Sequence, residues 1–115
     1  MPMADNIESR LEGDIMVCAI IGRLDAVSAE STSAELLSLI ASCESAKVLL
    51  DLSKLEYVSS LGLRVFVQAA KQLNGSGGTL KLCSATPPVQ KVLEISALDS
   101  LLDLRDNVAD ALGAF

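Results

Sequence analysis

The chain has 115 residues, the length of one domain, and carries a formal net charge of −6. Half of its residues are hydrophobic and 3% are aromatic, so we expect an aliphatic core. The acidity argues against nucleic-acid binding and against docking on an anionic membrane surface, because both need clustered Lys and Arg. No stretch approaches the roughly 18 apolar residues of a membrane span, and the first residues lack the features of a secretion signal. The sequence therefore predicts a cytoplasmic protein without membrane insertion or direct nucleic-acid contact.

The cysteine and histidine content limits the chemistry that the chain can perform. Cys18, Cys43 and Cys83 are far apart, and each lies in an apolar stretch, so we expect buried, reduced thiols. The chain has no histidine, which removes the Ser-His and Cys-His catalytic pairs and the usual zinc sites. We expect no catalytic residue, no metal and no cofactor.

The first third of the chain predicts two strands and a helix. Residues 6–11 and the apolar, β-branched residues 15–21 read as an antiparallel pair around a tight turn, with Gly22 ending the second strand. A helix follows and runs to Cys43. Two starts are possible for this helix: an early one capped by Asp25 or Ser28, and a later one with a capping box over residues 32–35.

The middle of the chain predicts a buried strand, a loop and a second helix. Residues 47–52 form a short apolar run, and the helix before it favours a parallel crossover. A loop then leads to two serines, Ser59 and Ser60, that open a helix. Apolar residues recur at helical spacing as far as the stop signal at residues 74–75.

The last third continues the alternation of strands and helices. Residues 79–84 read as a strand, and Thr86 is placed as the N-cap of a helix with a proline at its first position. Residues 101–104 are a possible last strand, and Asp106 is the expected cap of a closing helix. This order predicts an α/β fold with a mostly parallel sheet of four to five strands, an antiparallel N-terminal strand and about four helices.

The segment DLSKLEYVSSLGLR, residues 51–64, holds the candidate chemistry. Backbone N–H groups in the first turn of a helix lack internal partners, so a phosphate on a serine there is electrostatically favourable. Gly62 is expected to leave bare backbone beside the hydroxyls, open to close approach by another protein. The alternative is that Ser59 and Ser60 are ordinary helix caps.

The sequence resembles a known family at this segment. DLSKLEYVSSLGLRV is similar to the signature of the STAS domain, named after sulfate transporters and anti-sigma factor antagonists, in its small free-standing bacterial branch. GRLD at residues 22–25, GGTL at 77–80 and TPPV at 86–89 resemble other parts of that family's sequence pattern. The resemblance covers nearly the whole chain and implies a single STAS domain over residues 1–115.

The resemblance implies an anti-sigma factor antagonist that binds an anti-sigma factor with serine kinase activity. That kinase would phosphorylate the serine opening the second helix and so end the binding, and a phosphatase would restore it. By motif position the phosphoacceptor is Ser60. Family members commonly carry Asp immediately before that serine, whereas this chain has Ser59, which becomes the second choice.

Six residues are predicted to contact the partner: Asp25, Ser59, Ser60, Leu61, Gly62 and Arg64. For Asp25, a role in the site and a role as a helix cap weigh equally. Two other functions remain open: a STAS subunit of a bacterial lipid-transport ATPase complex, and a small ligand-sensing module. No Gly-rich phosphate loop supports a nucleotide site.

Overall fold

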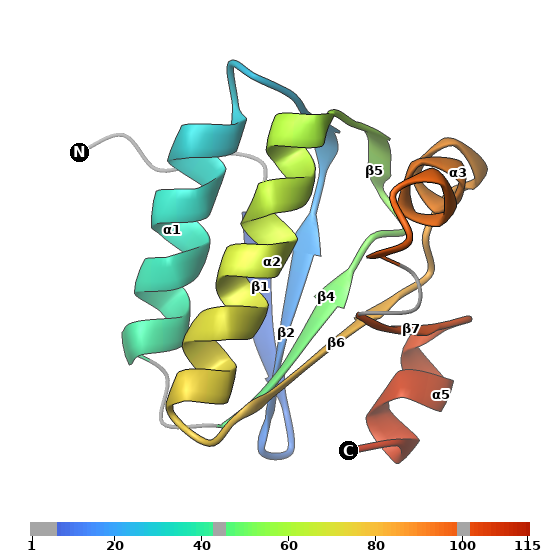
Figure 1. Ribbon diagram of the computed structural model, residues 1–115. Helices are drawn as coiled ribbons and strands as arrows, with labels where there is room; N and C mark the ends of the chain where they lie inside the picture. Colours follow the sequence, from blue (N-terminus) through green and yellow to red (C-terminus); the bar gives the residue numbers. More distant parts are fainter. Residues whose placement is uncertain (1–6, 43–45, 99–101) are drawn as a thin grey trace.

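The computed structural model describes residues 7–42, 46–98 and 102–115, and they form an α/β fold around a five-stranded sheet (Figure 1). The strand order is β1-β2-β4-β6-β7. Strand β1 is antiparallel to β2 and the other pairs are parallel, which confirms the predicted sheet. The bounds are β1 (Ile7–Glu12), β2 (Ile15–Ile20), β4 (Lys47–Asp51), β6 (Thr79–Cys83) and β7 (Asp103–Arg105).

The helices cover the two faces of this sheet unequally. Two long helices lie side by side on one face, and a short C-terminal helix covers the other (Figure 1). The helices are α1 (Ala29–Ser42), α2 (Ser60–Gly75), α3 (Pro87–Ile95) and α5 (Val108–Gly113). No helix among the described residues has the length and apolar character needed to span a membrane.

Strand β2 shows why the sheet is buried on both sides. Alternate residues such as Cys18 and Ile20 pack into the core beneath α1 and α2, while Ile15 and Val17 pack against α5. All six residues of β2 are buried. A strand covered on both faces reads as a continuous apolar run, which is what the sequence has here.

A second sheet of two short parallel strands, β3 (Gly22–Leu24) and β5 (Leu55–Val58), was not predicted. The predicted end of the second strand before Gly22 is confirmed, since β2 spans Ile15–Ile20, but Gly22 also opens β3, with φ +86° and with its N–H donating to the Lys54 carbonyl at 2.9 Å. Residues 53–58 were predicted as a loop. Only Leu55 and Val58 of β5 are buried, so the segment lacks the alternation that marks a strand.

The structure tests three of the predicted helix caps. Helix α1 begins at Ala29, so the early start is confirmed and the capping box over residues 32–35 is wrong. Asn107, not Asp106, caps α5, because its Oδ1 accepts from the Asp110 N–H at 2.8 Å. Thr86 is the N-cap residue of α3, yet its hydroxyl donates to the Leu55 carbonyl at 2.7 Å and ties α3 to β5.

Two of the cysteines are seen in the described residues. Cys18 and Cys83 are buried, as expected, and neither forms a disulfide with another described residue; burial raises the pKa of the Cys83 thiol. Cys43 lies outside the described residues. The last strand spans residues 103–105 rather than 101–104, and residue 101 is also outside the described part.

Candidate functional site

Ser59 is a helix cap held at both its backbone and its side chain. Its N–H donates to the Leu24 carbonyl at 2.9 Å, which fixes the start of α2 to the end of β3. Its Oγ accepts from the Gly62 N–H at 3.2 Å, and its own carbonyl accepts from Leu63. The Ser59 side chain therefore satisfies one of the N–H groups that a helix leaves open in its first turn, and the Ser59 carbonyl accepts the first regular bond of the helix.

Ser60 is the first residue of α2, and it is exposed. Its hydroxyl has no hydrogen-bond partner among the residues that the structure describes. The dipole of a 16-residue helix adds positive potential at this end. Of the two serines, Ser60 thus offers an exposed hydroxyl that makes no hydrogen bond with the described part of the chain.

Gly62 serves the interior of the fold, so its interpretation as bare backbone open to a partner is wrong. The residue is buried. A Cβ placed on it would lie 2.3 Å from the Leu24 carbonyl oxygen and 2.8 Å from a methyl group of Val58. Glycine is needed here because α2 crosses directly over the end of the β3–β5 pair.

Asp25 closes the turn that leads into α1 and also lies beside the serines. Its Oδ1 accepts from the N–H groups of Val27 at 3.0 Å and Ser28 at 3.2 Å, and its own N–H donates to the Ser28 hydroxyl at 3.0 Å. The hydrogen bond from the Ser28 N–H contributes most to lowering the pKa of Asp25. Asp25 follows Leu24, whose carbonyl accepts from the Ser59 N–H, so Asp25 lies close to the serines. Its position is compatible both with a contact to a partner and with a role at the start of the helix.

A cation–aromatic pair next to these residues was missed by the sequence analysis. The guanidinium carbon of Arg23 lies 4.5 Å from the centre of the Tyr57 ring, and Arg23 Nε lies 3.6 Å from Asp25 Oδ2. The two residues are cross-strand partners in the β3–β5 pair. Without that pairing, nothing in the sequence relates Arg23 to Tyr57.

Apolar side chains are exposed around the same end of the molecule. Both α1 and α2 begin at this end (Figure 1). Leu61 is 44% exposed, Tyr57 is 38% exposed, and Val27, in the turn before α1, is 91% exposed. We call the surface formed by Asp25, Val27, Tyr57, Ser60 and Leu61 the switch face.

A hollow of about 450 Å³ between α1 and α2 adjoins the switch face. Leu61 and Arg64 belong to its wall, and the Ser33 hydroxyl donates to Gln68 Oε1 at 2.7 Å between the two helices. The lining residues come from the start of α1 and the first half of α2: Ala26, Ala29, Glu30, Ser33, Ala34, Leu37, Leu61, Arg64, Val65 and Gln68.

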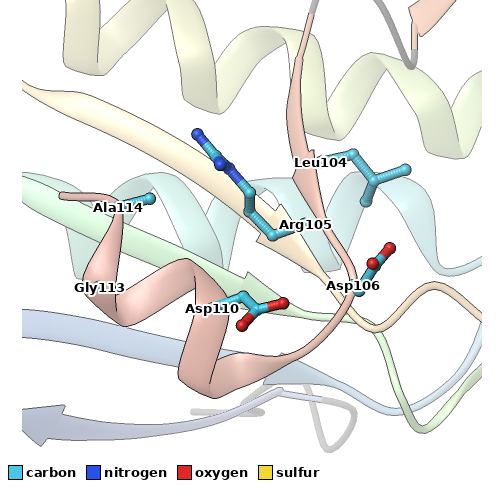
Figure 2. Close-up of a pocket in the computed structure, with 6 residues that line it drawn as sticks. All are labelled: Leu104, Arg105, Asp106, Asp110, Gly113 and Ala114. Atoms are coloured by element: carbon cyan, nitrogen blue, oxygen red, sulfur yellow. The ribbon is translucent and has the colours of Figure 1, made fainter.

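A different hollow, of about 470 Å³, lies between β7 and α5 (Figure 2). Asp106 and Asp110 border it together with Arg105, whose guanidinium is paired with Asp103 at 2.7 Å. It shares no lining residue with the α1–α2 hollow. Among the described residues no group of three His, Cys, Asp or Glu could hold a metal ion.

The sequence was then compared with known families. The family model of the STAS domain matches residues 6–111, nearly the whole chain. The chain belongs to the STAS domain family.

Relatives and solved structures agree with this assignment. A Bordetella bronchiseptica protein, BtrV, named as a candidate anti-sigma factor antagonist, is 37% identical over 92% of this chain and 90% of its own length. An anti-sigma factor antagonist from Mycobacterium paratuberculosis has the same fold, with a TM-score of 0.84, 21% identity and coverage of 94% and 91%. The Bacillus cell fate determinant SpoIIAA in its phosphorylated form also has this fold, with a TM-score of 0.70, 17% identity and coverage of 94% and 97%.

In this STAS domain the predicted partner residues divide into two groups. Asp25, Ser60, Leu61 and Arg64 have surface positions at or beside the start of α2, as the motif led us to expect. Gly62 is buried beneath them, and the Ser59 side chain is occupied as a cap. The exposed Val27 and Tyr57 were not among the predicted contacts. Their exposure follows from the β3–α1 turn and from β5, neither of which the sequence outlined.

Proposed function

We propose that this STAS domain is an anti-sigma factor antagonist whose binding is switched off by phosphorylation of Ser60. In this proposal the switch face docks on an anti-sigma factor that is also a serine kinase. The kinase phosphorylates Ser60 and the complex separates, and a phosphatase restores the binding form. The name of the 37%-identical relative supports the antagonist role, and the free, exposed hydroxyl of Ser60 supports the switch.

The choice of Ser60 over Ser59 is supported by the hydrogen bonds of the two hydroxyls. The Ser59 Oγ accepts from Gly62, so a phosphate there would have to replace a helix cap. The Ser60 side chain makes no such contact with the described residues and can be modified without loss of a capping bond. Ser60 is therefore the phosphoacceptor in this proposal.

The physical effect of the phosphate is electrostatic and steric. A phosphate adds about −1.5 to −2 charges and a large hydration shell at the centre of the switch face. Turning a mostly bound domain into a mostly free one requires about 5 kcal/mol of difference in binding free energy. Removing water from a doubly charged phosphate at a close-fitting interface can cost that much. The domain itself performs no covalent chemistry in this scheme.

Pull-downs from cells of origin test the proposal, with the captured proteins identified by mass spectrometry. We expect Ser60→Ala to retain an anti-sigma factor kinase at all times and Ser60→Asp to lose it by at least tenfold. Asn74→Asp is the matched control, because it adds the same charge at the exposed far end of α2 and should bind like the wild type.

Two results would overturn the proposal. One is equal retention of the kinase by Ser60→Ala and Ser60→Asp. The other is recovery of a lipid-transport ATPase in place of an anti-sigma factor, which would favour the alternative role of a STAS subunit in such a complex.

A further inference from the structure

Arg64 differs from the other arginines because no carboxylate of the described residues pairs with it. Arg10, Arg23 and Arg105 each pair with a carboxylate two residues away in the sequence, at 3.0, 3.6 and 2.7 Å. In the described parts of the chain, Arg64 forms no ion pair, and it is exposed. In a protein of net charge −6, this is an uncommitted cation next to the switch face.

The position of Arg64 on α2 matches that of a partner for Ser60. Residues four apart on a helix have Cβ atoms about 6 Å apart, and a negative group N-terminal to a positive one is the favoured order. Helix α2 carries Arg64 and Lys71 and no acidic residue. A phosphate on Ser60 would therefore meet a guanidinium that can bind two of its oxygens and that no carboxylate of α2 competes for.

The same geometry does not serve Ser59. Four residues after Ser59 stands Leu63, which is buried, and Arg64 is five residues on, where the helix has turned to another side. Arg64 is therefore placed to pair with a phosphate on Ser60 and not with one on Ser59.

We propose that Arg64 is the intramolecular counter-ion of a phosphate on Ser60 and acts as a positioning residue of the switch. This inference rests on the proposed modification of Ser60. Arg64 also lines the α1–α2 hollow, so its pairing with the phosphate removes a free cation from the wall of that hollow. Phosphorylation then changes the surface at two places: a negative group appears at Ser60, and the guanidinium of Arg64 becomes engaged in an ion pair with it.

The titration of the phosphate measures this pairing directly. Phosphoserine is incorporated at position 60 during translation, and its second pKa, ordinarily about 6, is followed by phosphorus NMR. With Arg64 present we expect this pKa to be lower by about half a unit than in the Arg64→Gln variant. Lys71→Gln removes the same charge about 16 Å from Ser60 along the helix axis, beyond the screening length of about 8 Å, and should leave the pKa unchanged.

A second arm uses phosphoserine at position 59, where Arg64→Gln should shift the pKa of the phosphate by clearly less than at position 60. Overlapping titration curves of the position-60 phosphate with and without Arg64 would overturn the inference, as would equal shifts from Arg64→Gln and Lys71→Gln. Because the phosphate is installed without a kinase, this result is independent of the pull-downs. Failure of the pairing would leave the antagonist role intact, and failure of the pull-downs would leave the pairing measurable.

Discussion

At Ser59 and Ser60 two adjacent hydroxyls have different physical surroundings. The Ser59 Oγ accepts a backbone hydrogen bond and helps to hold α2 in place, whereas the Ser60 side chain points to solvent at the positive end of the helix. If the capping residue Ser59 were itself phosphorylated, each phosphorylation would also remove the hydrogen bond that caps α2. Assigning the two tasks to neighbouring residues separates the structural role from the proposed regulatory one.

Gly62 ties the geometry of this helix start to the stability of the fold. In Gly62→Ala the added methyl group would lie 2.3 Å from the Leu24 carbonyl oxygen, so the helix or β3 has to move. We expect a loss of about 2–3 kcal/mol in the free energy of unfolding, measured by urea denaturation. An unchanged urea midpoint would show that α2 can shift without cost.

Gly75 on the same helix provides the control for that substitution. A Cβ on Gly75 meets no atom within 4 Å. Gly75→Ala should leave the stability unchanged or raise it by up to about 1 kcal/mol, because alanine restricts the unfolded chain more than glycine does.

At the level of the elements, the long or strongly patterned segments were predictable and the short ones were not. The apolar run of β2 and the helical spacing within α2 are strong signals, because burial of many residues fixes the period of the pattern. Strands β3 and β5 have three and four residues, and they are held by hydrogen bonds to each other and by Thr86. Those contacts join distant parts of the chain, so no local pattern reports them.

The same reasoning explains what was missed at the site. The serine motif could be placed at the start of a helix from its own residues and their resemblance to a family. The burial of Gly62 depends on where Leu24 lies, and the stacking of Arg23 on Tyr57 depends on the β3–β5 register. Both require the path of β3, a strand that the sequence analysis did not predict.

Strand β7 is held to the sheet edge by a cluster of charges that has a predictable pH dependence. The buried Lys81 donates to Asp103 at 2.5 Å, and Arg105 donates to the same carboxylate at 2.7 Å. Arg105 first, and Lys81 next, hold the pKa of Asp103 below its ordinary value of 3.8. The cluster therefore stabilises the fold above that value and loses its effect as the pH falls through the lower pKa of the folded state.

We expect Asp103→Asn to destabilise the protein by about 1–2 kcal/mol at pH 6, a figure reduced for the part of Asp103 open to solvent. The difference from the wild type should shrink as the pH falls from 5 towards 2, when measured by denaturant unfolding at each pH. Asp14→Asn removes the exposed pair of Asp14 with Lys47 and should have little effect at any pH. A pH-independent difference for Asp103→Asn would contradict the electrostatic explanation.

For the molecule as a whole, we expect the proposed phosphate on Ser60 to act by altered surface charge and not by a change of fold. The start of α2 is fixed by bonds that do not involve Ser60: the Ser59 N–H to Leu24, and the Leu63 N–H to Ser59. A phosphate on Ser60 can extend into solvent without breaking either of them. A ligand or modification moves a conformational equilibrium only if it interacts differently with two states, and these bonds are available with or without the phosphate.

We therefore predict that phosphoserine at position 60 leaves the global stability within about 1 kcal/mol of that of the unmodified protein, with a small gain from the helix dipole. Amide chemical shifts in a nitrogen–proton NMR spectrum should change at the switch face and in the first turn of α2, and remain constant in β6, β7 and α5. Shifts that spread through the sheet would indicate a conformational switch instead. If release acts through the surface alone, the phosphate should change the free energy of binding and hardly change the free energy of folding. The unfavourable contribution arises in the complex, where the partner has to exclude water from the modified face.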